Sequence, residues 1–342
     1  MRRAIGVGGY DDRRLPGHAR ALRKTTKVAG ENERRPRLDR ELGMILVTGG
    51  AGFIGSHVVD ALTSLGEEVV VLDSLVTGDR NNLPEDAKLV EMNIADSEVV
   101  GVIADLRPEA VIHAAAQVSV ASSMQDPYLD LEVNVGGTAN VLAGAKAARS
   151  SRFVFLSSGG GIYGESDGAN ESSLPRPKSY YSAHKYLAER YVEFSGLSYA
   201  IARLANVYGS RQRSDLEGGV VAIFMERLRN EQPVLINGTG KQRRDLVYVA
   251  DVVSALLTMM RSAADGVWNV GTGHSISVLE LLRTLEEQIK PAVDIHHGPP
   301  RSGDVNDSRL SIELIEKDLH WQPRHYLAEG IADTLQPENR GP

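Results

Sequence analysis

The sequence of 342 residues contains no cysteine, which excludes disulfide bonds, thiolate metal sites and cysteine nucleophiles. It also lacks any apolar run close to the about 18–20 residues that a membrane-spanning helix needs. No secretory apolar segment follows the arginines near the N-terminus. We therefore expect a cytoplasmic protein that does not bind membranes.

Positive charge is scarce outside the N-terminal segment. Residues 1–43 carry twelve Lys or Arg and six Asp or Glu, a balance of +6, which leaves a balance of −13 for residues 44–342. An acidic body of this kind argues against nucleic acid as a partner. The leader over 1–43 has few aliphatic residues and no clear periodicity, so we expect it to be disordered.

The sequence offers no pattern typical of a metal site. His296 and His297 are the only adjacent histidines, and neighbouring residues of an extended chain point to opposite faces. No acidic or thiolate partner lies near them at a usual ligand spacing. We expect no bound metal.

From residue 44 onward, strand and helix patterns alternate, as is typical of a doubly wound parallel sheet with helices on both faces. After residue 205 the alternation is looser. We predict an α/β protein with a Rossmann-type domain over 44–205 and a smaller C-terminal lobe over 206–342 that binds the substrate. Expected strands are 44–48, 68–73, 88–91, 110–115, 152–157, 199–204 and 233–236, and expected helices are about 53–65, 97–106, 129–149, 180–195, 218–229, 250–262 and 277–289.

A glycine-rich turn follows the first expected strand. Gly49 and Gly52 permit a tight turn and a close approach of the backbone to a pyrophosphate, and Gly55 allows the next helix to pack on the strand. The second expected strand ends in Asp73, whose carboxylate can accept hydrogen bonds from ribose hydroxyls and would repel a 2′-phosphate. The pattern predicts a binding site for NAD rather than NADP.

Tyr181 and Lys185 are four residues apart in an expected helix, so both side chains lie on one face. A nearby ammonium stabilises a phenolate, which turns tyrosine into a usable base, and it can also hold the nicotinamide ribose. Ser158 ends an expected strand, where it could share a proton with the tyrosine. The pair alone also fits an ordinary amphipathic helix, and the catalytic interpretation depends on the combination with Ser158.

These motifs resemble the extended short-chain dehydrogenase/reductases, and among them most closely the UDP-sugar 4-epimerases. The resemblance extends over about residues 44–325. The segments that carry it are Thr48–Gly55, His113–Gln117, Asn134–Thr138, Ser157–Gly164, Tyr181–Lys185, Arg203–Gly209, Arg244–Val249 and Arg301–Asp304.

The resemblance implies a role for each matching position. Tyr181 would take the proton of the sugar 4-hydroxyl, Lys185 would lower its pKa, and Ser158 would belong to the hydrogen-bond relay. A hydride would pass from C4 to NAD and return to the other face of the sugar. The cofactor would be bound by Gly49, Gly52, Phe53, Ile54, Gly55, Asp73, Asn93, Ile94, Ala114, Ala115, Ala116, Gln117 and Asn134, together with Tyr181 and Lys185.

The substrate is expected to be a UDP-sugar. Arg244 and Arg301 match diphosphate-binding arginines, a role that suits a planar and permanently charged group. Asp304 would bind ribose hydroxyls, and Ser308 would form a small wall of the hexose pocket that leaves room for an N-acetyl group. The remaining expected substrate contacts are Ser119, Ser158, Asn206, Arg213 and Val220.

Related reactions need groups that this sequence lacks. The 4,6-dehydratases that it resembles place an Asp-Glu pair after the strand-end hydroxyl, and decarboxylases of UDP-glucuronate carry a Glu in the same loop. Gly159, Gly160 and Gly161 occupy that stretch here, and glycine cannot act as an acid or a base. Reductive epimerases that use a cysteine acid are also excluded. Simple 4-epimerisation needs none of these groups.

The identity of the sugar depends mainly on Arg213. It aligns with an arginine that meets the sugar carboxylate in UDP-glucuronate 4-epimerases, so we favour UDP-glucuronate. Asn206 and the segment Gly218–Phe224 instead resemble UDP-glucose 4-epimerases, which makes UDP-glucose the alternative substrate. A non-catalytic NAD sensor is a more distant alternative. We also expect a homodimer, paired through the helices at 129–149 and 180–195.

Overall fold

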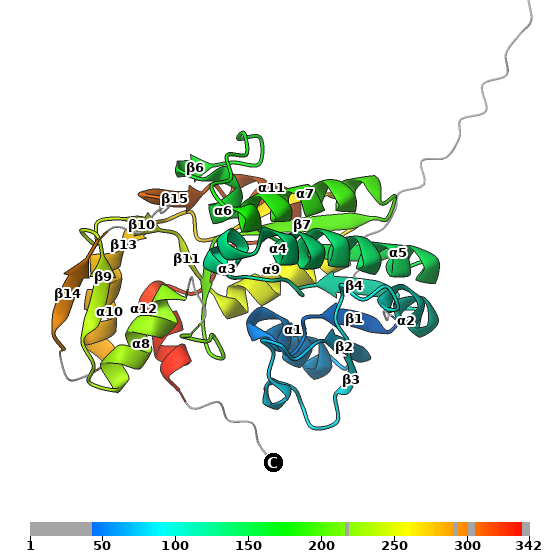
Figure 1. The fold of residues 1–342 in the computed structure, drawn as a ribbon, viewed down its shortest axis with the longest axis horizontal. Coiled ribbons are helices and arrows are strands. Elements are labelled where there is room, and N and C mark those ends of the chain that lie inside the picture. Colours follow the sequence, from blue (N-terminus) through cyan, green and yellow to red (C-terminus); the bar gives the residue numbers. More distant parts are fainter. Residues whose placement is uncertain (1–42, 216–218, 290–292, 300–304, 337–342) are drawn as a thin grey trace, which may run out of the picture. The chain divides into compact units, whose positions relative to one another are not determined.

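The computed structural model describes residues 43–215, 219–289, 293–299 and 305–336. The leader predicted over 1–43 therefore lies outside the described residues, except for Gly43. Within them, a seven-stranded parallel sheet has the order β12-β7-β5-β4-β1-β2-β3 (Figure 1). Its strands are β1 (Ile45–Thr48), β2 (Val69–Asp73), β3 (Lys88–Glu91), β4 (Ala110–His113), β5 (Arg152–Ser158), β7 (Tyr199–Leu204) and β12 (Gly266–Val270).

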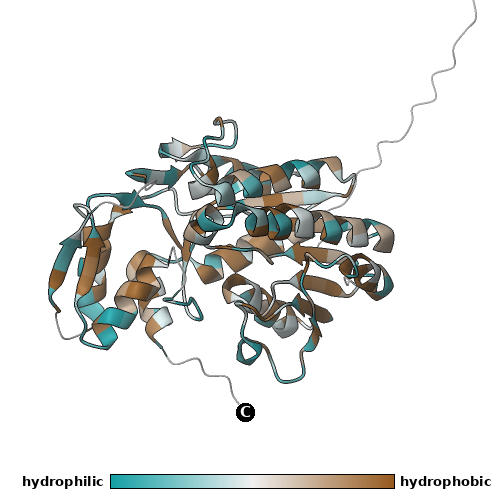
Figure 2. Ribbon diagram, viewed as in Figure 1, coloured by the Kyte–Doolittle hydropathy of each residue, from teal (hydrophilic) through white to brown (hydrophobic). Residues whose placement is uncertain are grey.

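The sheet is buried on both faces because its strands are apolar at nearly every position, as parallel strands covered by helices require. In β1, Ile45 and Val47 pack on one face and Leu46 on the other. Figure 2 shows strands of this sheet largely in brown, the colour of hydrophobic residues. Helices α1 (Phe53–Ser64), α9 (Val249–Arg261) and α11 (Glu313–Leu319) contribute to the first cluster, and α2 (Val99–Leu106), α5 (Thr138–Ala148) and α7 (Tyr180–Phe194) to the second.

A third apolar cluster lies in the C-terminal part of the chain. It is formed by α8 (Val220–Arg229), β9 (Val234–Asn237), α10 (Val278–Gln288) and α12 (Leu327–Leu335), and β9 pairs with β14 (Ile295–Gly298). A four-stranded sheet has the order β13-β10-β15-β6, and β8 pairs with β11. The bounds of these strands are Ile276–Ser277, Arg243–Arg244, Asp307–Leu310, Ser166–Ala169, Asn206–Tyr208 and Leu246–Tyr248, in that order.

The chain passes between these parts more than once. Strand β12 and helix α9 come from the C-terminal part of the sequence but belong to the main sheet and its covering layer, whereas β6 joins β15 in the smaller sheet. The described residues belong to one compact unit. A boundary placed at residue 205 therefore does not separate two independent sheets.

The sequence prediction is confirmed for the doubly wound fold, and the predicted strands of the main sheet agree with the observed ones to within two residues. The helical stretch expected over 129–149 is confirmed, because the chain is helical without a break over 127–148. It is not one regular α-helix, however, but consists of α4 (Pro127–Leu131), a π-helical turn (Glu132–Gly137) and α5. Such a wide turn is frequent at functional sites. Its Gly137 lies so close to Ile94 that a Cβ there would be 2.6 Å from that side chain.

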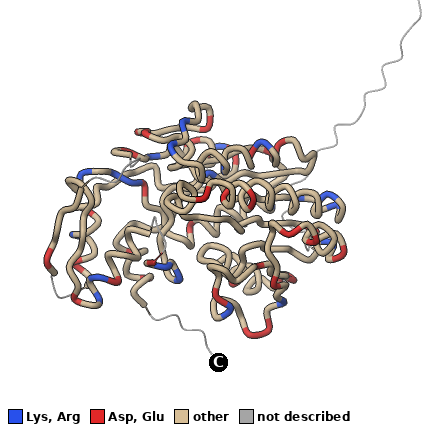
Figure 3. Tube along the Cα trace, in the orientation of Figure 1, with Lys and Arg blue, Asp and Glu red and all other residues tan. Residues whose placement is uncertain are grey.

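Charged residues of both signs are interspersed along the described chain, as Figure 3 shows. Across the same residues, every helix is too short or too polar to pass through a bilayer. They also hold no cluster of three or more His, Asp or Glu that could bind a metal ion. His296 and His297 lie on β14, where both are exposed.

Candidate active site

The turn between β1 and α1 brings two backbone segments into close contact. Gly49 has a φ of +67°, and a Cβ on it would lie 2.5 Å from the backbone nitrogen of Ala115. A Cβ on Gly55 would lie 2.1 Å from the carbonyl oxygen of Gly49. Only glycine fits either position. The first turn of α1 contains no acidic residue, so its free N–H groups and positive dipole end suit an anion such as a pyrophosphate.

Asp73 at the end of β2 faces this turn. Its Oδ2 accepts a hydrogen bond from the Ala51 N–H at 2.9 Å, and its Oδ1 accepts one from the Leu75 N–H at 2.9 Å. Each carboxylate oxygen keeps a second lone pair that can accept from a ribose hydroxyl. The glycine turn and Asp73 together therefore fit a dinucleotide with an unsubstituted 2′-hydroxyl.

A cavity of about 1000 Å³ extends from this turn to the end of β5 and to α7. This volume lies at the upper end of ligand pockets. Most of the residues that the sequence analysis selected line this cavity. Those that line it are Gly49, Gly52, Phe53, Ile54, Gly55, Asp73, Asn93, Ile94, Ala114, Ala115, Ala116, Ser158, Tyr181, Lys185, Asn206, Arg213, Arg244 and Ser308.

Four of the selected residues lie elsewhere. Ser119 caps α3 (Val120–Gln125), where its Oγ accepts the Ser122 N–H at 3.0 Å. Gln117 and Asn134 belong to a hydrogen-bond network behind the cavity wall. Val220 is the first residue of α8 and is half-buried. Arg301 and Asp304 lie outside the described residues, so their expected roles stay predictions.

Ser158, Tyr181 and Lys185 form the polar centre of the cavity. Ser158 ends β5, where its Oγ accepts the Gly161 N–H at 3.4 Å and lies near Tyr181 on α7. Burial raises the pKa of Tyr181 to about 12, and the neighbouring Ser158 hydroxyl opposes this rise. In the protein alone the tyrosine is therefore protonated at neutral pH, and it can act as a base only where a neighbouring positive charge stabilises its phenolate.

Lys185 is buried next to Tyr181, with its Nζ 4.2 Å from the centroid of the Phe155 ring. Burial lowers the pKa of Lys185 to about 7, and the carboxylates of Glu189 and Asp130 oppose this change. A lysine with this pKa carries a proton in only part of the molecules at neutral pH. A neighbouring negative charge, such as a phenolate, would favour its ammonium form.

The sequence analysis missed several buried residues that support these three. Glu189, four residues after Lys185, accepts hydrogen bonds from Ser157 Oγ at 2.6 Å and from Arg203 Nη2 at 2.6 Å, which joins α7 to β5 and β7. Burial, and to a lesser degree the nearby Lys185, lower the pKa of His113 to about 3, so this side chain is neutral. The spacing of Lys185 and Glu189 was the signal available for Glu189, whereas His113 stood in the segment His113–Gln117 that carries the resemblance but was not selected as a site residue.

Arg213 does not present a free guanidinium to the cavity. Its Nε and Nη2 contact the two carboxylate oxygens of Asp215 at 2.9 and 2.5 Å, and its Nη1 donates to the carbonyl oxygen of Thr77 at 3.2 Å. About half of the side chain is exposed. Because Asp215 already occupies the fork that a sugar carboxylate would need, the structure gives the glucuronate prediction no support.

The segment that precedes Arg213 is hydrogen-bonded to helix α1, which follows the glycine turn. His57 Nε2 lies 3.0 Å from the carbonyl oxygen of Ser210, and Arg211 Nη2 lies 2.6 Å from Asp60 Oδ2. Arg211 has a φ of +65°, a conformation that non-glycine residues adopt only when surrounding contacts hold it. Arg211 and Gln212 also line the cavity, and the sequence analysis did not select them.

Comparison with known proteins agrees with this geometry. The model of the NAD dependent epimerase/dehydratase family matches residues 45–271. The UDP-glucose 4-epimerase of Mycolicibacterium smegmatis is 39% identical over 303 residues, which cover 85% of this chain and 97% of that protein.

Two solved structures have a similar fold. The UDP-glucose 4-epimerase of Thermotoga maritima, determined with UDP-glucose, is 43% identical with a TM-score of 0.82. The UDP-glucose 4-epimerase of Thermus thermophilus, determined with NAD, is 41% identical with a TM-score of 0.81. Each likeness covers 85% of this chain and 97% of the other. The chain therefore belongs to the NAD dependent epimerase/dehydratase family and, within it, to the UDP-sugar 4-epimerases.

Proposed function

We propose that this enzyme interconverts UDP-glucose and UDP-galactose by epimerisation at C4, with NAD as its cofactor. The observation that carries the proposal is the grouping of Ser158, Tyr181 and Lys185 in one cavity with the glycine turn and Asp73. Bound NAD supplies the acceptor that takes a hydride from C4 and gives it back. A protein that only binds NAD as a sensor would not need a tyrosine placed beside a serine and a buried lysine.

The side chains of this protein would move the proton. Tyr181 Oη would take the proton of the 4-hydroxyl as C4 is oxidised to a ketone, and would return it to the same oxygen as C4 is reduced. Ser158 would hold that oxygen, since its hydroxyl can donate to the ketone and accept from the tyrosine. Lys185 would stabilise the phenolate that Tyr181 must carry before it takes this proton and again after it returns it. Loss and return of one hydride and one proton leave no net redox change.

The segment Gly159–Gly161 favours epimerisation over elimination. It begins α6 (Gly159–Tyr163), and a Cβ on Gly161 would lie 2.6 Å from Ser182 Oγ and 3.0 Å from Ser158 Oγ. A Cβ on Gly159 would lie 2.7 Å from the side chain of Leu310. These positions have no room for the acid and base side chains that a dehydratase needs.

The choice of UDP-glucose over UDP-glucuronate is supported by Arg213 and by the relatives. A sugar carboxylate would have to displace Asp215 from the arginine, whereas a neutral hydroxymethyl group needs no cation there. The similar proteins from Mycolicibacterium smegmatis and Thermotoga maritima are named UDP-glucose 4-epimerases. We therefore revise the preference that the sequence alone suggested.

The sugar can be identified with purified protein and no added reductant. We expect the anomeric proton signals in NMR spectra to show conversion of UDP-glucose to UDP-galactose and no conversion of UDP-glucuronate. Arg213→Ala is expected to keep at least about half of the UDP-glucose activity, because exposed ion pairs contribute little. Conversion of UDP-glucuronate alone, abolished by the same substitution, would instead make Arg213 the carboxylate ligand.

We also propose a homodimer that pairs through α4 and α7. Figure 1 shows these two helices side by side. They carry exposed apolar side chains that a monomer would leave in water, namely Tyr128, Leu129, Leu131, Leu187, Tyr191 and Phe194. Light scattering should give the mass of two chains, and Tyr191→Glu should give that of one. A parent protein with the mass of a single chain would refute the dimer.

A further inference from the structure

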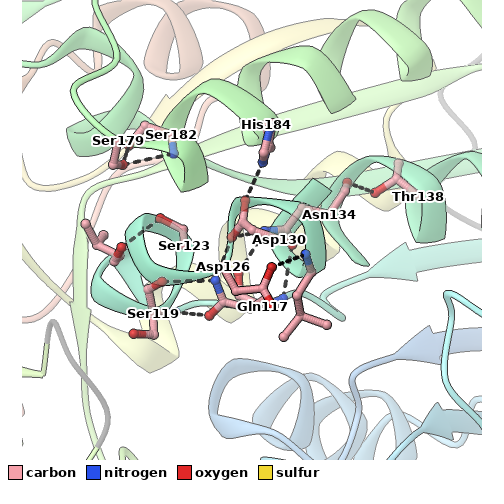
Figure 4. A network of polar contacts seen from close by, with 12 residues as sticks. Gln117, Ser119, Ser123, Asp126, Asp130, Asn134, Thr138, Ser179, Ser182 and His184 are labelled. Atoms are coloured by element: carbon pink, nitrogen blue, oxygen red, sulfur yellow. Dashed lines mark hydrogen bonds and ion pairs between the residues drawn. The ribbon is translucent and has the colours of Figure 1, made fainter. Parts of the chain in front are cut away.

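Asp130 is a buried carboxylate to which the proposed reaction assigns no role. Its side chain is completely buried in α4. Its Oδ1 accepts hydrogen bonds from Gln117 Nε2 at 2.6 Å and from Asn134 Nδ2 at 3.0 Å, and its Oδ2 lies 2.6 Å from His184 Nδ1 (Figure 4). Burial of an ionised carboxylate is costly unless donors of this kind satisfy it.

The partners of Asp130 do not line the cavity, but they adjoin residues that form two different walls of it. Asn134 Oδ1 accepts the Gln117 N–H at 3.0 Å, and Asn134 Nδ2 donates to the Gln117 carbonyl oxygen at 2.9 Å, so the backbone of Gln117 is held from both sides. Gln117 directly follows the cavity-lining residues Ala114–Ala116. His184 lies on α7, between Tyr181 and Lys185. One carboxylate thus bonds to both α7 and the loop after β4 that contains Ala114–Gln117.

We propose that Asp130 and His184 form a clamp of positioning residues. The clamp sets the position of Tyr181 and Lys185 relative to the cavity-lining residues Ala114–Ala116 in the loop after β4. Oδ1 of Asp130 bonds to the loop after β4 and Oδ2 bonds to α7. Loss of either contact therefore removes this link between the two walls of the cavity. Catalytic groups must be held to within about 0.5 Å of their productive geometry. This inference rests on the proposed epimerase function.

The proposed role is geometric and not electrostatic. Burial is the largest influence on the pKa values of both Tyr181 and Lys185, and the charge of Asp130 is a smaller one. An asparagine at position 130 can keep the geometry without the charge. Its oxygen would accept from Gln117 and Asn134, and its amide would donate to His184 Nδ1 once the histidine carries its proton on Nε2.

Four single variants and one double variant of the NAD-loaded protein test the clamp. Asp130→Ala and His184→Leu are expected to lower kcat by about 10²-fold, the effect of a misplaced catalytic group, with unchanged KM for the UDP-sugar and unchanged NAD content. Asp130→Asn and His184→Asn keep a hydrogen bond between the two positions and should retain most of the parent kcat. The double variant Asp130→Ala with His184→Leu should be no slower than Asp130→Ala alone, since each single substitution already removes the same contact between Asp130 and His184.

Hydrogen exchange gives a readout that does not depend on turnover. In Asp130→Ala, exchange should rise in peptides over 115–120 and 180–186 and stay unchanged over 249–261. The matched control is Asp251→Ala. Asp251 is also a buried carboxylate, with His325 Nδ1 at 2.9 Å, but it does not line the cavity. The control should lower stability and leave kcat unchanged.

Two results would overturn the clamp. One is a parent-like kcat and parent-like exchange in Asp130→Ala. The other is an equal loss of kcat in Asp251→Ala at matched stability, which would mean that any damage to a buried carboxylate has this effect. If the parent converts no UDP-sugar, the proposed function fails, whereas the exchange measurements still decide whether Asp130 holds the two walls together.

Discussion

Tyr181→Phe is expected to lower kcat for UDP-glucose by about 10³-fold, within the range that loss of a positioned acid–base group produces. The phenylalanine keeps the ring in its half-buried place in the cavity wall, so the fold and NAD binding should be preserved. It removes the only atom of this side chain that can carry the proton of the 4-hydroxyl. Single-turnover and steady-state rates from NMR or a coupled assay measure the loss.

The matched control for this substitution is Tyr180→Phe. Tyr180 is the preceding residue on α7, and it is exposed and does not line the cavity. It should therefore keep the parent rate. A Tyr181→Phe protein that binds NAD and loses less than about tenfold in kcat would show that another group carries the proton.

Lys185→Met should have two opposite effects. The activity should fall by about 10²-fold, because no ammonium remains to stabilise the phenolate. The protein should become more stable near pH 6 by at least about 1.4 kcal/mol, the value of one pKa unit. Burial disfavours the charged lysine, and methionine fills a similar volume without a charge. Such an exchange of stability for activity is common at catalytic sites.

The gain in stability should depend on pH in a defined direction. The folded protein holds the Lys185 proton only up to a pH of about 7, whereas an unfolded lysine holds it to about pH 10. Between these values the unfolded state binds more protons, so the stability of the parent rises with pH. The difference between variant and parent should therefore shrink from pH 6 to pH 10. Urea unfolding at several pH values measures it, and a constant difference would contradict the assignment to Lys185.

Much of the site could be read from the order of residue types along the chain. Glycines at fixed spacing, an acid at the end of the second strand and a tyrosine four residues before a lysine each depend on local geometry. The structure places these residues around one cavity. Six of the seven strands of the main sheet were equally legible, since buried parallel strands are continuous apolar runs, whereas β12 was not predicted. The helical stretch over 129–149 was legible too, but the π-helical turn inside it was not, because such a turn leaves no clear mark on the spacing of apolar residues.

The preference for UDP-glucuronate failed for a related reason. Sequence similarity identified Arg213 as a cation at a suitable position, but it could not tell what the guanidinium contacts. Asp215 lies two residues away and binds the guanidinium through both carboxylate oxygens. The carbonyl oxygen of Thr77, in a loop distant in the sequence, accepts a third hydrogen bond from Arg213. The partner of a charge depends on side-chain directions, which the order of residues does not specify.

Local patterns in this sequence thus suffice to predict the Rossmann-type fold and to select the glycine turn, Ser158, Tyr181 and Lys185, which line one cavity, because each depends on a spacing of a few residues. The contacts that support them join residues far apart in the chain. Asp130 meets His184 across 54 positions, and Arg211 meets Asp60 across 151. Burial, which shifts the pKa values of Tyr181 and Lys185, is likewise a property of the packed molecule. Such contacts exist only once the sheet and its helices have assembled, since no local rule brings those side chains together.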